Sequence, residues 1–179
     1  GQTFTGHLTT FDDAIRMVKV LAKSRDLDLQ VLPVIKFPWF YSNEGKDISS
    51  VILESSIANS VTADTVLYLK CYDPEELQRI YKSLLQGLPI EVKLILGVDR
   101  KDGRETMRLK RGSWVSYSYD WIFTRLGVRA LSAYSHGLSF VTQDITDEET
   151  LVRLIEDSHG LNMKVFVGMD TSLPPDALE

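Results

Sequence analysis

The sequence predicts an α/β protein: a mixed, largely parallel β-sheet covered by helices, in the order αβαβαββαβαβ. The first observation is a near-repeat, because residues 93–99 resemble residues 164–170 at a constant offset of 71 positions. Each copy follows another apolar run that ends in aspartate, with a helix-like stretch between the two runs. Parallel neighbouring strands need a crossover of a dozen or more residues, usually a helix. The pattern therefore indicates two strand–helix–strand units, which arose by duplication or resemble each other because buried strands have similar compositions.

Length and composition support one soluble domain. A chain of 179 residues, 44% hydrophobic and 25% charged, is typical of a single globular domain, here residues 1–179 with flexible termini at 1–8 and 171–179. No apolar run approaches the roughly 18 residues of a membrane span, and no secretory signal is evident. The lone Cys71 lies in an apolar run and is expected to be buried. We therefore expect a cytoplasmic protein that does not contact membranes.

The first elements are a helix and an edge strand. Residues 10–24 show apolar positions at helical spacing, and Thr10 with Asp13 forms a short capping box at the start. Residues 29–37 read as a strand. Pro33 lies within that strand and cannot donate a ladder hydrogen bond, so the strand is expected at an edge or a bulge.

The next segments are a loop, a helix, a strand and a second helix. Residues 37–45 are rich in aromatic side chains and end in turn-forming residues, which predicts a loop. Asp47 is a suitable cap for a helix that reaches residue 61. Residues 65–72 form an apolar strand, and residues 73–87 then begin with a cap, a proline and two acids and stop at a glycine, as helices do.

The middle of the chain predicts a strand and a hairpin. Residues 90–98 are an apolar strand, and the Asp-Gly turn in residues 99–103 predicts an antiparallel return over residues 106–111. Residues 119–134 form an expected helix interrupted by a glycine. The antiparallel return over residues 106–111 also allows an alternative fold, a ferredoxin-like α+β core over residues 65–143. The remaining expected elements are a strand at 138–143, a helix at 146–158 and a strand at 163–169.

Four aspartates follow predicted strands. In open α/β sheets ligands bind outside the carboxyl ends of the strands, where Asp73, Asp99, Asp144 and Asp170 are expected. If they converge, they could hold Mg²⁺ or Mn²⁺ for phosphate chemistry. Helix capping and turn formation also explain these residues, and this simpler interpretation is favoured. We therefore expect no cofactor under the leading interpretation.

A second acidic candidate is Glu91 with Lys93. Two residues apart on a strand, their side chains share one face, and some nucleases use such a pair with an upstream aspartate, here Asp64, to bind a metal. Residues of such common types often coincide by chance. The pattern therefore carries less weight than the strand-end aspartates.

The centre of the chain is basic. The net charge is −5, yet residues 91–136 hold nine Lys or Arg against five Asp or Glu. Cations near aromatic rings can bind phosphates and stack bases, so nucleic acid is a candidate partner, although a solvated strand face is favoured because acids are interleaved. The candidate phosphate contacts are Arg104, Arg108, Lys110, Arg111, Arg125, Arg129 and His136.

Three consecutive aromatic residues, Trp39, Phe40 and Tyr41, occupy the expected loop. Large rings either fold back on their own core or bury against a partner, and aromatics are enriched at interface cores. Because the preceding strand is expected at a sheet edge, a second subunit could reach these rings. The segment therefore predicts a homo-oligomer.

The leading functional interpretation is a non-enzymatic binding or regulatory module of unknown ligand that self-associates. Clustered glycines that would cradle a phosphate do not follow any expected strand, and the known nucleophile motifs do not occur. The alternative is a phosphoesterase or nuclease that depends on a divalent metal and uses the strand-end aspartates and the basic centre. Fold alone does not decide between them.

Overall fold

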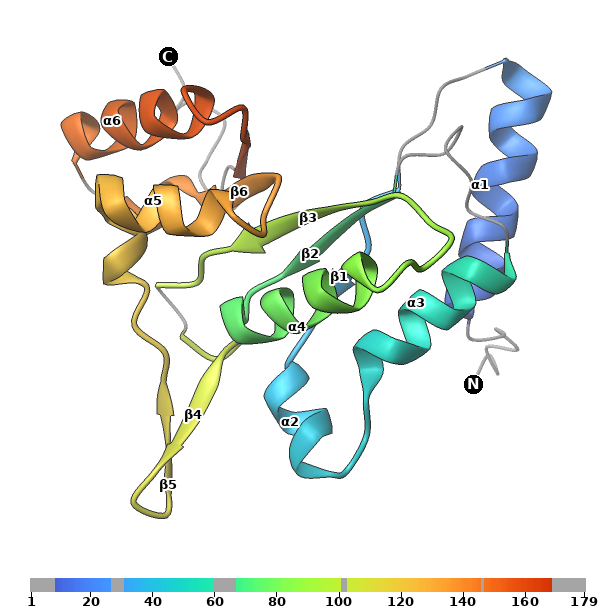
Figure 1. The fold of residues 1–179 in the computed structure, drawn as a ribbon, viewed down its shortest axis with the longest axis horizontal. Coiled ribbons are helices and arrows are strands. Elements are labelled where there is room, and N and C mark those ends of the chain that lie inside the picture. Colours follow the sequence, from blue (N-terminus) through green and yellow to red (C-terminus); the bar gives the residue numbers. More distant parts are fainter. Residues whose placement is uncertain (1–8, 27–30, 60–66, 101–102, 146, 169–179) are drawn as a thin grey trace, which may run out of the picture.

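The computed structural model describes residues 9–26, 31–59, 67–100, 103–145 and 147–168. It confirms the α/β class, with a five-stranded sheet flanked by helices and a separate two-stranded hairpin (Figure 1). The expected flexible termini, residues 1–8 and 171–179, lie outside the described residues. The extent of a single domain over the whole chain stays a prediction.

The main sheet is entirely parallel and has the strand order β1-β2-β3-β6-β7. Each strand therefore lies beside the main-sheet strand that precedes it in the chain. The hairpin, β4 with β5, is inserted between β3 and β6 in sequence and is antiparallel. The strands are β1 (Val34–Ile35), β2 (Leu67–Cys71), β3 (Val92–Gly97), β4 (Met107–Lys110), β5 (Ser113–Ser116), β6 (Gly137–Val141) and β7 (Lys164–Gly168).

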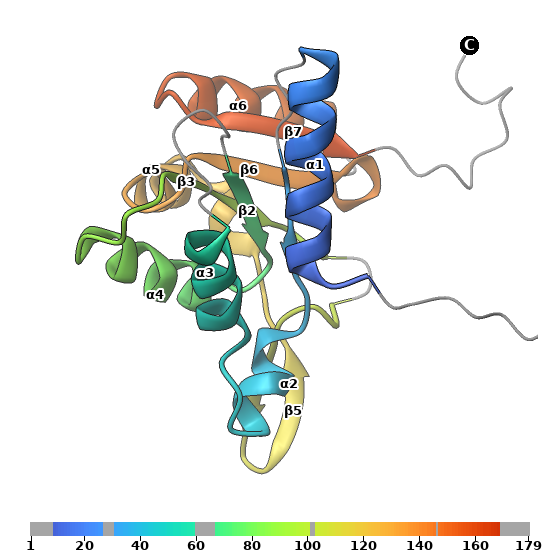
Figure 2. The ribbon, with the colours of Figure 1, turned by 90° about the vertical axis from the view of Figure 1, so that its right-hand side faces the viewer.

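Helices flank the sheet, and all except α1, which precedes β1, lie in the connections between parallel strands. They are α1 (Phe11–Arg25), α2 (Pro38–Asn43), α3 (Ile48–Ala58), α4 (Pro74–Leu85), α5 (Arg125–Ser132) and α6 (Glu148–His159), with short 3₁₀ turns η1 (Asp120–Phe123) and η2 (Thr142–Asp144). Crossovers between parallel strands are right-handed, so strands added in sequence order place their helices on one face. Figure 1 accordingly shows α4 and α5 in front of the strands, and Figure 2 places α3 on the same side.

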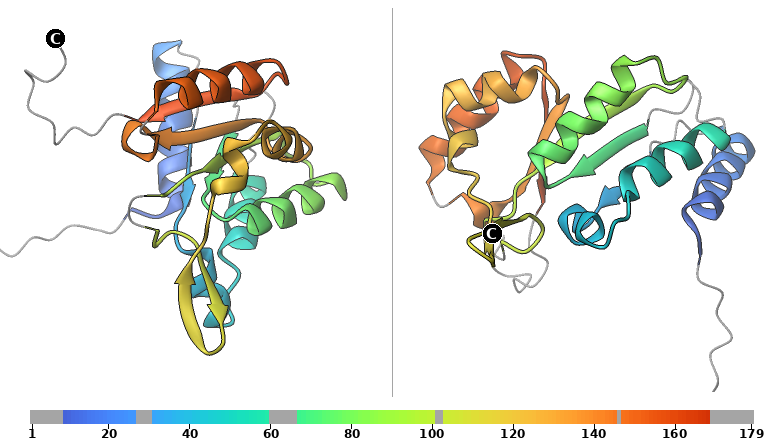
Figure 3. Two further views of the ribbon diagram at one scale, coloured as in Figure 1. Left: turned by 90° about the vertical axis from the view of Figure 1, so that its left-hand side faces the viewer. Right: turned by 60° about the horizontal axis from the view of Figure 1, so that its bottom comes forward.

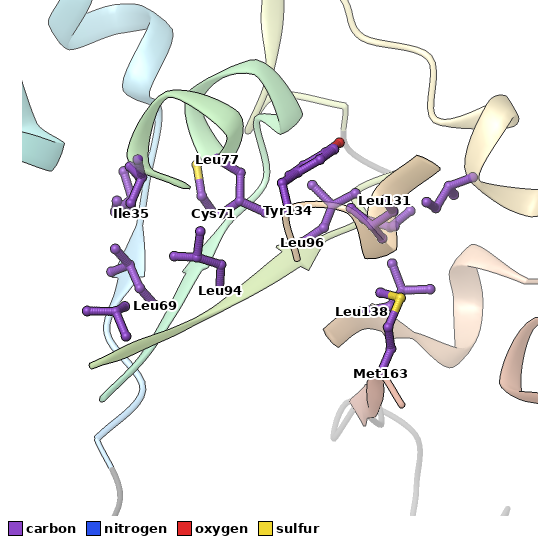
Figure 4. Packing of buried hydrophobic residues seen from close by; sticks show 14 of the residues in the cluster. Ile35, Leu69, Cys71, Leu77, Leu94, Leu96, Leu131, Tyr134, Leu138 and Met163 are labelled. Atoms are coloured by element: carbon purple, nitrogen blue, oxygen red, sulfur yellow. The ribbon is translucent and has the colours of Figure 1, made fainter. Parts of the chain in front are cut away.

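The main core lies between this helical layer and the sheet (Figure 4). Side chains alternate along a strand, so every second residue of β2 points toward the helices. Leu67, Leu69 and Cys71 belong to the core cluster, whereas Tyr68 and Lys70 do not. Cys71 is fully buried, as expected, and burial raises the pKa of its thiol far above the usual range. The opposite sheet face carries Tyr68 and the partly exposed Lys70.

The predicted hairpin is wrong in its pairing. Residues 107–110 do not return along β3; they pair with residues 113–116 across a turn at Arg111 and Gly112, whose φ angles are 51° and 81°. Gly103 has a φ angle of 60°, but no described strand returns along β3 after it. Because the five main strands are all parallel, the ferredoxin-like alternative is also wrong. Figure 3 shows the hairpin extending beyond the sheet, beside α2.

Several local predictions are confirmed. Thr10 and Asp13 form the capping box of α1, and Asp47 and Asp73 cap α3 and α4. Pro33 precedes a strand that lies at the sheet edge. The aromatic segment is not a loop, however, because a proline at its first turn starts the short helix α2.

The two similar strands, β3 and β7, lie in one parallel sheet and are separated only by β6. Lys93 and Lys164 both lie near the amino ends of these strands. A duplication as its origin stays a prediction. No described helix is both long and apolar enough to cross a membrane.

Candidate functional site

The candidate site lies at the carboxyl ends of the parallel strands, on the sheet face turned away from the core. Lys36 directly follows β1, and Lys70 and Tyr72 lie at the end of β2. Ser139 of β6 is aligned with Gly97 of β3. Ligands of parallel sheets bind at such strand ends. We call the following five residues the lysine site: Lys36, Lys70, Tyr72, Glu105 and Ser139.

Lys70 reaches across the neighbouring strand. Its Nζ donates a hydrogen bond of 2.9 Å to Ser139 Oγ, although β3 lies between β2 and β6. The crossing requires Gly97, because a Cβ at this position would lie 2.9 Å from Lys70 Cε and 2.6 Å from Tyr72 Cδ1. The absent side chain therefore creates the space in which the lysine and the tyrosine ring lie.

The electrostatics of the site are dominated by two ammonium groups near one ring. Lys36 Nζ and Lys70 Nζ lie 5.0 and 4.7 Å from the ring centroid of Tyr72. Burial, and then repulsion from Lys36, lower the pKa of Lys70, while Glu105 and Asp144 act in the opposite direction. Burial, followed by the charge of Glu105, raises the pKa of Tyr72 to about 12, so its hydroxyl is neutral near pH 7. The two ammonium groups thus lie close to the carboxylates of Glu105, Asp99 and Asp144.

Glu105 is the carboxylate that contacts Lys36, through Oε1. Its backbone is held in place, because Asp99 Oδ2 accepts hydrogen bonds from the backbone N–H groups of Arg104 and Glu105 at 3.1 and 3.2 Å. Trp39 Nε1 donates to the Arg104 carbonyl oxygen at 3.1 Å. The segment is thus attached to the ends of both β1 and β3.

Thr106, which follows Glu105, helps to hold the segment around Glu105 next to the end of β2. Tyr119 is buried, and its hydroxyl donates to the Tyr72 carbonyl oxygen at 2.7 Å and lies 3.0 Å from Thr106 Oγ1. The Tyr117 N–H donates to the Thr106 carbonyl oxygen at 3.0 Å. These contacts give Glu105 a rigid backbone.

The hairpin is fastened to the start of α4. Arg108 of β4 donates two hydrogen bonds of 2.7 Å to the carboxylate of Asp73, and its guanidinium lies 5.0 Å from the Tyr117 ring centroid. On the other side, the rings of Trp39 and Trp114 are 4.7 Å apart. Paired hydrogen bonds of this kind give a charged contact both strength and direction.

The three strand-end aspartates that the structure describes do not form a metal cluster. Asp73 caps α4 and pairs with Arg108, and Asp144 is buried and accepts hydrogen bonds from the backbone N–H groups of Arg100 and Val141. Asp170 lies outside the described residues. Within the described residues, no group of three or more His, Cys, Asp or Glu side chains could hold a metal ion. Metal binding by these aspartates stays a prediction.

The Glu91 and Lys93 pair lies at the opposite end of the sheet from the lysine site. Glu91 immediately precedes β3, and its Oε1 lies 2.8 Å from Lys93 Nζ. Asp64, the third expected member, lies outside the described residues.

The basic residues of the centre are distributed over three parts of the fold. Arg104, Arg108, Lys110 and Arg111 belong to the hairpin and the segment before it. Arg125 and Arg129 are on α5, where Arg125 Nε lies 3.0 Å from Asp157 Oδ1. His136 lies at the amino end of β6, and its Nδ1 accepts a hydrogen bond from the Leu94 N–H. A single nucleic-acid surface is not assembled, and nucleic-acid binding stays a prediction.

The aromatic residues expected at a subunit interface divide into two kinds. Trp39 folds back onto Trp114 of the hairpin, whereas Phe40 is 49% exposed. Tyr41 lies next to Phe40, with ring centroids 5.7 Å apart. Self-association through this segment stays a prediction.

The sequence interpretation missed the lysine site. One signal was present, because a lysine in the middle of an otherwise apolar strand, as at position 70, must have a reason to be there. Alternation places Lys70 on the opposite side of β2 from the buried leucines. The reach of Lys70 over Gly97 to Ser139, and the folding of Glu105 onto Lys36, depend on the tertiary structure.

Two curated enzymes resemble this chain. A glycerophosphodiester phosphodiesterase of Treponema pallidum is 34% identical over 134 residues, which cover 73% of this chain and 37% of the relative. A glycerophosphodiester phosphodiesterase of Haemophilus influenzae is 33% identical over 131 residues, which cover 72% of this chain and 36% of the relative. The chain thus spans little more than a third of the length of these relatives. No family model matches the sequence.

These similarities overturn the expectation of a non-enzymatic module. Both relatives are named as phosphodiesterases, so the phosphoesterase alternative agrees with the comparison and the leading interpretation does not. The expectation failed because it depended on the absence of a recognisable catalytic motif in the sequence.

Proposed function

We propose that this chain provides the phosphate-binding strand ends of a phosphodiesterase that acts on glycerophosphodiesters. The observation that carries the proposal is the pair of ammonium groups, Lys36 and Lys70, around the ring of Tyr72 at the carboxyl ends of β1 and β2. The similarity to two enzymes named for this reaction supports it. Because the chain spans only part of those relatives, both activity and substrate belong to the proposal.

The lysine site matches the charge of the proposed substrate. Hydrolysis of a phosphodiester adds water at phosphorus, breaks one ester bond to phosphorus and releases an alcohol, while negative charge grows on the phosphoryl oxygens. Ammonium groups fixed at those oxygens stabilise that charge. Ser139 contributes as a donor: because its Oγ accepts a hydrogen bond from Lys70, its own O–H is available for a phosphoryl oxygen.

A divalent cofactor, Mg²⁺ or Mn²⁺, remains a prediction. The carboxylates near the site are Asp99, Glu105 and Asp144, and each already contacts backbone N–H groups or an ammonium group. The described residues therefore do not fit a metal centre made of three or more carboxylate, imidazole or thiolate ligands. The proposed roles accordingly belong to the lysine, serine and tyrosine side chains.

Three sequence-based expectations continue as proposals. We propose that the chain acts as one domain, that it works in the cytoplasm and that it self-associates. The buried lone thiol supports the cytoplasmic location, because reducing compartments are where proteins lack disulfides. Exposure of Phe40 supports self-association.

Phosphate binding and hydrolysis test the proposed function. We expect the chain to bind inorganic phosphate in low salt by titration calorimetry, and Lys70→Met and Lys36→Met each to weaken binding about tenfold or more, as loss of a charged hydrogen bond does. Hydrolysis of glycerophosphocholine, followed by release of choline, should be lost in the same variants.

Lys82→Met is the matched control, because Lys82 is exposed on α4, away from the lysine site. It should leave both measurements unchanged. A wild-type chain that binds neither phosphate nor glycerophosphocholine would overturn the proposed function, as would equal losses in Lys82→Met and Lys70→Met.

A further inference from the structure

The hairpin of β4 and β5 extends beyond the main sheet and ends in residues that are both basic and apolar (Figure 3). Leu109 and Trp114 are paired directly across the two strands, so their side chains share one face, and they are 59% and 39% exposed. Lys110 and Arg111 lie at the turn, and both are exposed. We call Leu109, Lys110, Arg111 and Trp114 the hairpin tip. The hairpin tip therefore exposes apolar surface and positive charge together.

The hairpin tip is positive in a protein that is negative as a whole. Residues 106–119 contain the cations Arg108, Lys110 and Arg111 and no acid, although the chain has a net charge of −5. Arg108 is paired with Asp73. Within the part of the chain that the structure describes, Lys110 and Arg111 have no acidic partner. Their charges are therefore available to an anionic partner.

The base of the hairpin is held in place, so the tip is presented in one orientation. Arg108 is bonded to Asp73 at the start of α4, and the ring of Trp114 lies 4.7 Å from that of Trp39 on α2. The two turn residues have φ angles of 51° and 81°, as the tightest hairpin turns require. A preorganised surface loses little conformational entropy when it binds.

We propose that the hairpin tip docks on an anionic lipid surface. Lys110 and Arg111 meet the acidic headgroups, and Leu109 and Trp114 enter the boundary between headgroups and acyl chains. Tryptophan is enriched at that boundary, and each Lys or Arg near an anionic leaflet strengthens binding about fivefold. The sequence led us to expect no contact with membranes because it contains no spanning segment, but a docked hairpin needs none.

The side chains of the hairpin tip favour lipid over nucleic acid. Single strands stack their bases on the faces of aromatic rings, whereas the Trp114 ring is already in contact with Trp39. Leu109 is the more exposed of the two apolar residues and gains free energy among acyl chains, but it cannot stack on a base. Arg125 and Arg129 lie on α5, in another part of the fold. The cations that would follow a nucleic-acid backbone are therefore not gathered at the tip.

A second copy of the chain is a poorer partner for the hairpin tip than lipid. Symmetric dimers place the same surface of both subunits in contact, so Lys110 and Arg111 would lie near the same residues of the other copy. Like charges at such a contact repel each other. The proposed self-association depends on Phe40 of α2, which is not part of the hairpin tip.

Sedimentation of the full chain with lipid vesicles measures the docking. We expect vesicles of phosphatidylcholine with about one third phosphatidylserine to bind the chain about tenfold or more tightly than vesicles of phosphatidylcholine alone. The double variant Lys110→Ser and Arg111→Ser should lose this preference. Lys23→Ser with Lys82→Ser, which removes two exposed cations of α1 and α4, is the matched control and should keep it.

The apolar part of the contact is measured separately. Leu109→Ser should weaken binding to the acidic vesicles about fivefold or more, whereas Leu85→Ser, at an exposed apolar residue of α4, should not. Brominated acyl chains should quench the tryptophan fluorescence of the wild type. Trp114→Phe should lose most of this quenching, although it retains Trp39 and Trp121.

The outcomes are distinct. Failure of the wild type to bind either kind of vesicle, or equal binding to both, would overturn the docking of the hairpin tip on anionic lipid. Binding of a single-stranded oligonucleotide in place of acidic vesicles would assign the tip to nucleic acid, and a lower oligomeric state of Leu109→Ser in light scattering would assign it to a second copy; either result would overturn the proposal. If a variant fails to fold, the preference of the wild type for acidic vesicles still decides.

The lysine site is not needed for docking. Lys70→Met should therefore bind acidic vesicles as the wild type does, even where it no longer binds phosphate. Loss of vesicle binding in Lys70→Met would assign the lipid contact to the lysine site and overturn the role of the hairpin tip.

Discussion

Gly97 and Lys70 lie on adjacent strands, and the missing side chain of the first makes room for the second. A Cβ on Gly97 would be 2.9 Å from Lys70 Cε, closer than side-chain carbons come in practice. The ammonium group can therefore pass over β3 and reach Ser139 on the next strand. The proposed phosphate site thus depends on a residue that has no side-chain functional group.

The substitution Gly97→Ala should damage the site more than the fold. The added methyl group displaces the Tyr72 ring and Lys70, so we expect about tenfold weaker phosphate binding and a loss of about 1–3 kcal/mol in the free energy of unfolding, as for other overpacked positions. Calorimetry and urea denaturation measure the two effects. Gly160→Ala, at the end of α6, is the control and should retain phosphate binding. An unchanged phosphate affinity in Gly97→Ala would contradict the role assigned to this glycine.

Phosphate affinity should fall with rising pH earlier than ordinary lysines predict. Burial, and then the charge of Lys36, lower the pKa of Lys70, so its ammonium group loses its proton below the usual value of about 10.4. In titrations from pH 8 upward, we expect phosphate binding to weaken about tenfold as Lys70 loses its proton. Lys70→Arg keeps its charge and should remove the early loss; if it does not, another group is responsible.

The lowered pKa of Lys70 affects the free energy of unfolding in the opposite direction to phosphate affinity. Because the pKa of Lys70 is lower in the folded state, the unfolded chain binds more protons between the two pKa values. The contribution of Lys70 to the free energy of unfolding therefore rises with pH through that window and is lost as pH falls below it. Urea denaturation of wild type and Lys70→Met at several alkaline pH values measures this difference.

Asp73 should be a major stabilising residue through two independent contacts. Asp73→Ala removes both the cap of α4 and the partner of Arg108, and we expect a loss of about 2–4 kcal/mol in the free energy of unfolding. Asp73→Asn keeps an oxygen for the cap and should lose less. Denaturation curves for both variants measure the difference, and equal losses would show that the cap contributes nothing.

Self-association should depend on Phe40 rather than on Trp39. Phe40 is 49% exposed, whereas Trp39 packs on Trp114 and donates a hydrogen bond to the Arg104 carbonyl oxygen. We expect Phe40→Ser to convert an oligomer into a folded monomer in light scattering. A wild-type chain that is monomeric at high concentration would end the self-association proposal.

The sequence predicted the parts of the fold that have local causes. The capping residues Thr10, Asp47 and Asp73 begin helices because their side chains bond to backbone N–H groups a few residues away. Parallel strands were predicted because a helix-like stretch of suitable length separates each pair of apolar runs. The prediction of the hairpin was wrong because Asp102-Gly103 and Arg111-Gly112 are both turn signals. Which of them joins two paired strands depends on the strand pairing of the whole fold.

The lysine site could be predicted only in part. The sequence shows a lysine at position 70 within an apolar strand, on the face opposite the buried leucines, but its reach depends on Gly97, which belongs to a different strand. Glu105 comes near Lys36 only because Asp99, Trp39 and Tyr119 fold the intervening segment back. Such contacts are set by tertiary structure.

The reactivity of the Cys71 thiol can report how often the hydrophobic core opens. The thiol is the only one in the sequence, is fully buried and faces Leu77 and the other core residues (Figure 4). A thiol reagent can therefore react only when β2 and its helical cover separate, so the labelling rate counts openings of the core. Because Lys70 precedes Cys71 on the same strand, a bound phosphate that restrains Lys70 should slow labelling. The labelling rate of Cys71, on one sheet face, would then report whether phosphate is bound at Lys70, on the opposite face.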